Sequence, residues 1–162
     1  MTDSQIIDHI IHSFSSFNLR DIVEINNHEK LEFTIAEFIL CSCFIDQVSG
    51  FRYNTDKVGS RYRQFVKEYL PQYDAYDLYN DLRNKLVHNY SIGSHYGVVR
   101  KKPHLHLQKV NGLTLLNLEN FISDLSSALN KYSSELRIDN DIRKKALCWF
   151  SKYKIIGLTV QP

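Results

Sequence analysis

The residues best suited to chemistry lie in one octapeptide, Arg83-Asn84-Lys85-Leu86-Val87-His88-Asn89-Tyr90. It places a fixed cation, an amide, an imidazole and a phenol within about two helical turns. An imidazole titrates near cellular pH and transfers protons, and a guanidinium stabilises negative charge on a phosphate. The octapeptide therefore predicts acid-base chemistry beside a phosphate group.

The octapeptide opens a window, from Leu82 to Leu118, that contains no Asp or Glu. The window carries the cations Arg83, Lys85, Arg100, Lys101, Lys102 and Lys109 and the histidines His88, His95, His104 and His106. Local positive charge attracts polyanions. We expect RNA contacts from Lys85, Arg100, Lys101 and Lys102. A solvated hairpin loop is the alternative interpretation of residues 100–103.

Most of the chain around these residues is predicted to be helical. Apolar residues recur at helical spacing after a capping box at Thr2 and Gln5, which predicts a first helix to about Asn26 with an interruption near residues 15–18. Further helices are predicted over residues 29–48, 56–70 and 74–91, then from Asn117 as N-cap, and finally from a cap at Asp139 or Asn140. Ser49-Gly50 is expected to end the second of these helices.

Between the fourth and fifth helices, at about residues 96–116, the apolar period changes to two. Residues 96–99 predict a short strand, and Leu105 and Leu107 alternate with polar residues as in a second strand. Asn111-Gly112 is a strong hairpin signal. We therefore expect an all-α fold in the main, an up-down bundle of about six helices with a small β-hairpin inserted at 96–116.

Length and composition are those of one ordinary globular domain spanning residues 1–162. The 162 residues are 43% hydrophobic and 23% charged, with a formal net charge of +2, which excludes disordered and collagen-like chains. Three cysteines, two of them in an apolar run, argue against a disulfide framework. The N-terminus lacks a signal-peptide pattern, and no apolar run approaches the roughly 18 residues of a membrane span, so we expect a soluble cytoplasmic protein without membrane association.

The motif's geometry on a helix suggests that its cleft is incomplete. On an α-helix Asn84 and His88 share an adjacent face, whereas Arg83 and His88 lie about 140° apart around the axis. This wide arc predicts that another surface faces the motif and completes the cleft.

The stretch RNKLVHNY resembles the signature of the HEPN superfamily (higher eukaryotes and prokaryotes nucleotide-binding), in which Arg, usually followed by a polar residue, precedes His near the end of a core helix. The spacing Arg-x4-His matches, and the helical context extends over about residues 4–136. His88-Asn89-Tyr90 also resembles the His-x-Tyr extension of HEPN toxins that are paired with minimal nucleotidyltransferase antitoxins.

The resemblance implies a metal-independent endoribonuclease that uses no cofactor and whose cleft forms between two protomers. His88 is then the general acid or base, Arg83 stabilises the scissile phosphate, and Asn84 orients His88 or the phosphate. Attack by the ribose 2′-hydroxyl leaves a 2′,3′-cyclic phosphate and a 5′-hydroxyl. Tyr90 resembles the residue to which such antitoxins attach adenylate. A toxin-antitoxin, phage-defence or stress system is the implied setting.

Other interpretations remain open at this stage. Arg83 is alternatively a structural residue tied to Asp77 or Asp81, with His88 capping the helix and Tyr90 as a core aromatic. The chain is alternatively a non-catalytic HEPN-like module that dimerises or binds a nucleotide or a partner. His95, His104 and His106 suggest a third and weaker candidate, a metal site, because histidines two apart on a strand face the same way.

Overall fold

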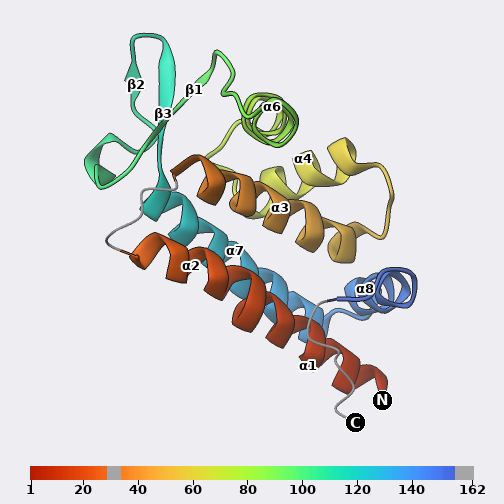
Figure 1. Cartoon of the computed structure of the whole chain (residues 1–162). Coiled ribbons are helices and arrows are strands. Elements are labelled where there is room, and N and C mark those ends of the chain that lie inside the picture. The colour runs from red at the N-terminus through yellow and green to blue at the C-terminus, as the bar shows by residue number, and fades with distance from the viewer. Residues whose placement is uncertain (29–33, 156–162) are drawn as a thin grey trace.

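The computed structural model describes residues 1–28 and 34–155, and its described part is mostly helical, as the sequence predicts (Figure 1). The helical elements are α1 (Asp3–Ser13), η1 (Phe14–Leu19), α2 (Arg20–Asn27), α3 (Thr34–Tyr53), α4 (Val58–Tyr69), α5 (Ala75–Asp77), η2 (Leu78–Asn84), α6 (Lys85–Asn89), η3 (Pro103–Leu105), α7 (Leu118–Ile138) and α8 (Asn140–Lys152). The strands are β1 (Tyr96–Val99), β2 (Lys109–Val110) and β3 (Leu113–Asn117). The predicted helical bundle with a small β insertion is confirmed.

The first predicted helix is one continuous rod in three parts, α1, η1 and α2, which lies beside α7 (Figure 1). The Thr2 and Gln5 capping box is present. The expected interruption is a π-helical segment, η1, in which the Ser15 hydroxyl donates to the carbonyls of Ile11 and His12 at 3.0 and 3.2 Å. A serine that hydrogen-bonds the preceding turn competes with the backbone bonds of the helix and often bends it.

The central helix α3 continues to Tyr53, so the predicted end at Ser49-Gly50 is wrong. Gly50 instead allows a close approach, because a Cβ there would lie 2.6 Å from Cε2 of Trp149. The helix gives way to Asn54, whose φ of 50° is the left-handed conformation that an asparagine tolerates. The predicted start near residue 29 lies outside the described residues.

By length and composition α3 would also pass as a membrane span, with a mean hydropathy of 1.3. However, 56% of its apolar window is buried inside the protein, as expected of a core helix. Figure 1 shows α3 among α4, α7 and α8.

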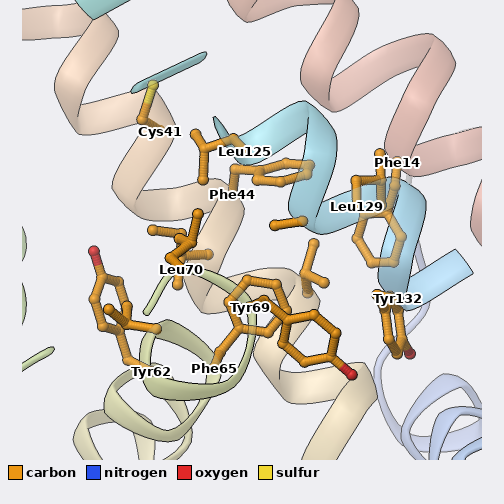
Figure 2. Close-up of a cluster of buried hydrophobic side chains, with 14 of the residues drawn as sticks. Phe14, Cys41, Phe44, Tyr62, Phe65, Tyr69, Leu70, Leu125, Leu129 and Tyr132 are labelled. Carbon is orange, nitrogen blue, oxygen red and sulfur yellow. The ribbon is translucent and has the colours of Figure 1, made fainter. Parts of the chain in front are cut away.

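The core is rich in aromatic side chains, and several of the helices contribute them (Figure 2). Phe14, Phe44, Phe65 and Tyr132 are at most 2% exposed and come from η1, α3, α4 and α7 in turn. Phe14 meets Phe44 and Phe51 edge to face, with ring centroids 6.2 and 5.2 Å apart. Such packed aromatic contacts fix the relative positions of the helices that carry the candidate site.

The three strands form a sheet in the order β1-β3-β2 at one end of the bundle, near α6 (Figure 1). The Asn111-Gly112 turn is confirmed, with φ values of 50° and 82°, and joins β2 antiparallel to β3. The strand predicted through Leu105 and Leu107 is wrong, because Pro103 begins the 3-10 turn η3 there. β1 pairs with β3 in parallel, which the hairpin pattern does not predict.

The predicted caps of the last two helices are confirmed in position. Asn117 precedes α7, although its side chain bonds the Lys102 N–H and Asn120 in place of the helix N-terminus. The Asp139 carboxylate accepts from the backbone N–H groups of Asp141 and Ile142 at the start of α8.

Candidate functional site

The octapeptide lies on the helical stretch predicted over residues 74–91, observed as α5, η2 and α6 in direct succession. The Asp74 carboxylate caps its start by accepting from the N–H groups of Tyr76 and Asp77 at 2.9 and 2.8 Å. Tyr90 ends it with a φ of 51°. The π-helical middle, η2, was not predicted. It includes Arg83 and Asn84, while α6 carries His88.

Arg83 is the centre of the site, and its guanidinium contacts three residues. Nε and Nη2 bind Oδ2 of Asp46 on α3, at 2.8 and 2.7 Å. Nη1 donates to Oδ1 of Asn84 at 3.1 Å and meets Nε2 of His88 at 3.1 Å. A guanidinium has five N–H groups, so these contacts occupy four of them. The three residues assigned to catalysis therefore form one hydrogen-bonded cluster.

The wide arc between Arg83 and His88 does not keep their side chains apart, since the two are in contact within one chain. Two features bring the side chains together. Hydrogen bonds in a π-helix join residues five apart, so the helix twists less per residue in η2, which includes Arg83 and Asn84. The Arg side chain is also long enough to reach along the helix. The arc consequently provides no argument for a second surface, and a dimeric cleft needs separate support.

His88 is exposed, and its contact with Arg83 defines its tautomer. A guanidinium only donates, so Nε2 of His88 accepts and carries no proton in this arrangement. A neutral imidazole with a lone pair on an exposed edge is the form that a general base requires.

Asp46 is the site residue that the sequence interpretation missed, since it tied Arg83 to Asp77 or Asp81. Its side chain and that of Arg83 are each 16% exposed. Burial raises the pKa of the Asp46 carboxyl, although the hydrogen bonds and charge of Arg83 and the charge of Arg61 oppose this shift. An isolated acid in an apolar helix needs a buried partner, and that signal was present in the run from residue 38 to residue 48.

Tyr90 is 70% exposed and is therefore no core aromatic. Its left-handed backbone turns the chain away from α6, two residues after His88. The phenol makes no hydrogen bond within the described chain, so its oxygen is accessible to a modifying enzyme.

Lys85 points toward Asp81, with its Nζ 3.6 Å from Oδ1. Asp81 also accepts from the backbone N–H and from Nδ1 of His95, at 2.7 and 2.6 Å. Burial alone would raise the pKa of Asp81, but the hydrogen bonds and charge of His95 and the charge of Lys85 lower it below its ordinary value. Gly93 makes room, because a Cβ there would lie 2.0 Å from Cγ of Asp81. Asp81 thus fastens the segment after the motif to the motif helix.

This network gives the protein a specific acid sensitivity. An acid with a folded pKa below its unfolded value of about 3.9 stabilises the fold at higher pH, and that stabilisation is lost as pH falls through the folded pKa. We expect Asp81→Asn to be less stable than the wild type above about pH 5, with the difference shrinking below about pH 4. Urea unfolding of both proteins across this range measures it. A difference that stays constant down to pH 3 would contradict the assignment.

The expected RNA-binding cations do not share one environment. The side chain of Arg100 is only 10% exposed, lies 3.7 Å from Glu37 and 3.6 Å from Glu119, and donates to the Asn26 carbonyl. Arg100 therefore joins elements of the fold, and we do not retain it as an RNA contact. Lys101 and Lys102 are exposed, and their ammonium groups have no carboxylate partner in residues 1–28 and 34–155.

The hairpin histidines occupy separate surroundings. His104 lies in the 3-10 turn η3, so the strand that would have aligned it with His106 is absent. His106 accepts from the Asn117 N–H and contacts the Tyr73 hydroxyl, which donates to Asp124. Burial lowers the pKa of His106, against the raising effect of Asp124. No group of three or more potential metal ligands occurs within the described residues.

Comparisons with protein-family models, with curated proteins and with solved structures found no match to this chain. The case for a function therefore depends on the motif and on the geometry of the site.

Proposed function

We propose that the protein is a metal-independent endoribonuclease of HEPN type, which cleaves RNA by attack of a ribose 2′-hydroxyl. The observation that carries the proposal is the contact of Arg83 Nη1 with His88 Nε2, at 3.1 Å, on the exposed end of α6. It places a phosphate-binding cation and an unprotonated imidazole nitrogen within reach of one ligand.

In the proposed reaction His88 Nε2 takes the proton of the 2′-hydroxyl, and the resulting 2′-oxygen attacks the adjacent phosphorus. The bond from phosphorus to the 5′-oxygen breaks, and that oxygen is protonated as it leaves. Arg83 transfers an Nη1 hydrogen bond from His88 to a phosphate oxygen, where negative charge accumulates. Asn84 Oδ1 keeps the guanidinium in position.

A second copy of the chain completes this site in the proposal. The attacking and leaving oxygens of a phosphoryl transfer lie roughly in line on opposite sides of phosphorus. One imidazole therefore does not reach both, and the described residues place only His88 beside Arg83. The second copy's His88 enters the reaction protonated and gives its proton to the leaving oxygen, while the first His88 ends the step protonated. A homodimer with a shared cleft, acting in the cytoplasm, is the proposed assembly.

Product chemistry tests the proposal directly. We expect the purified protein to cut end-labelled single-stranded RNA in excess EDTA and to leave 2′,3′-cyclic phosphate ends, which acid treatment opens to monophosphates. The same oligonucleotide with 2′-deoxyribose at the cut position should resist cleavage. Cleavage of that substituted strand, or activity that requires added metal, would exclude the mechanism.

One observation favours a non-catalytic alternative, in which the chain is an HEPN-like module that dimerises or binds a nucleotide or a partner. Arg83 is 16% exposed and already has four of its five N–H groups engaged, as in a structural residue. RNA binding without cyclic-phosphate products in the same assay would support this alternative.

The exposed phenol of Tyr90 supports a further part of the proposal, regulation by a nucleotidyltransferase-type antitoxin. Adenylate on the Tyr90 oxygen would add bulk and negative charge two residues from His88. Negative charge there repels the RNA backbone. This fits a toxin-antitoxin or phage-defence setting.

A further inference from the structure

A pocket of about 560 Å³ opens on the other side of Asp46, between α3, α4 and the end of α8. Its lining includes Asp46, Asp56, Arg61, Trp149, Tyr153 and Lys154. Figure 1 shows α4 and α8 on opposite sides of α3, and both helices contact α3. The volume is typical of sites for small organic groups.

The wall of the pocket that α8 supplies is a fixed aromatic surface. Trp149 packs onto Gly50 of α3, where a Cβ would lie 2.6 Å from the indole. The Tyr153 ring lies 4.5 Å from the indole between centroids, and the Arg61 guanidinium lies 5.0 Å from the Trp149 ring. Trp149 is only 6% exposed, so a ligand in the pocket reaches a small part of the indole, whereas the neighbouring Tyr153 is 43% exposed. An exposed aromatic ring is a surface on which a nucleobase stacks.

The charges around the pocket favour an anionic strand. Asp46 is paired with Arg83, and Asp56 is paired with Lys152 and Tyr153, so both acids are neutralised. Lys154 is exposed with no carboxylate partner in the described part of the chain. Arg61 donates to the Thr55 carbonyl, but its buried Nε has no hydrogen-bond partner among the described residues.

Asp46 connects this pocket to the proposed catalytic cluster. Its carboxylate lines the pocket and holds Arg83 through Nε and Nη2. Asp46 is thus shared by the pocket and by the cluster that contains Arg83.

We infer that this pocket accepts a nucleobase of the RNA, next to the scissile link, which lies against Trp149 while Lys154 attracts the backbone. The inference rests on the proposed ribonuclease function, because it places the scissile phosphate at Arg83. The pocket then determines which position of the strand meets His88.

Trp149 is the only tryptophan of the chain, so its fluorescence reports on the pocket alone. The experiment titrates the full-length protein with a short 2′-O-methyl RNA, which lacks the attacking hydroxyl and stays intact. We expect saturable quenching of the Trp149 emission, and no quenching by the same backbone without bases. Equal quenching by the base-free strand would overturn the inference, and so would RNA binding seen by fluorescence anisotropy with unchanged Trp149 emission.

Charge-reversal variants provide the matched comparison. Lys154→Glu should weaken binding of the 2′-O-methyl RNA by about five- to tenfold. Lys144→Glu, at an exposed position of α8 outside the pocket, should stay within about twofold of the wild type. Equal effects of the two variants would overturn the inference. A nucleoside monophosphate that binds as tightly as the oligonucleotide would assign the pocket to free nucleotides instead.

The outcomes separate this inference from the proposed function. Cyclic-phosphate products without a change in Trp149 emission would support the ribonuclease function and contradict the base pocket. A change in Trp149 emission that depends on bases, without cleavage, would support the pocket and contradict the ribonuclease function.

Discussion

Replacing His88 by alanine is expected to lower the rate of RNA cleavage by about 100- to 10,000-fold, the usual contribution of a positioned general acid or base. Both proposed proton transfers, from the 2′-hydroxyl and to the leaving oxygen, use this residue, once in each copy, so we expect the upper part of the range. The side chain is exposed, and the fold should therefore persist. Initial rates on labelled RNA in EDTA, with circular dichroism of both proteins, measure the effect.

His104→Ala is the matched control for this substitution. His104 is also an exposed histidine, but it lies in η3 outside the cluster. Its replacement should leave the rate within about threefold of the wild type. Cleavage that persists in His88→Ala at the wild-type rate would refute the assignment of His88, whatever the effect of His104→Ala.

Asp46→Ala is expected to reduce both stability and cleavage. The substitution leaves a mostly buried guanidinium without its carboxylate, which destabilises a fold by several kcal/mol. Because both side chains retain some exposure, we expect about 2–4 kcal/mol, measured as the free energy of unfolding in urea. Cleavage should fall too, since Asp46 directs Arg83 toward His88.

Two comparisons define this effect. Asp8→Ala breaks an exposed ion pair with Arg137 and should change stability by less than about 1 kcal/mol. The double variant Asp46→Ala/Arg83→Met should be more stable than Asp46→Ala, because it removes the stranded charge. The raised pKa of Asp46 indicates that burial outweighs the pairing with Arg83, as in many buried ion pairs. A double variant less stable than Asp46→Ala would contradict this account.

The contacts of the site differ from those expected from the sequence. Arg83, Asn84 and His88 were expected to need a facing surface, yet they meet within one chain. Among the described residues only one imidazole, that of His88, lies beside Arg83. The proposed dimer is therefore supported by the in-line geometry of phosphoryl transfer and not by the arc around the helix.

Local signals predicted much of the fold. The Thr2 capping box, the Asn111-Gly112 turn and the Asp139 cap depend on residues three or fewer apart, and each is where the pattern indicates. Predictions failed where a distant residue decides the local outcome. Gly50 continues a helix because Trp149 packs on it, and β1 pairs with β3 in parallel across an intervening segment.

The helical class and the helix that bears the motif could both be predicted from the sequence. The sequence also indicated Arg83, Asn84 and His88 as the residues of the motif that are suited to chemistry. These follow from periodicity and from spacing within one helix, which act over short range. Which charged side chains pair with one another became known from the tertiary structure alone. The pairing of Arg83 with Asp46, 37 residues away, and the burial of Arg100 near Glu37 depend on which helices pack together. The acid-free window appears as a cationic surface in the sequence, but folding brings acids from other helices to several of its cations, and electrostatic pairing acts through space.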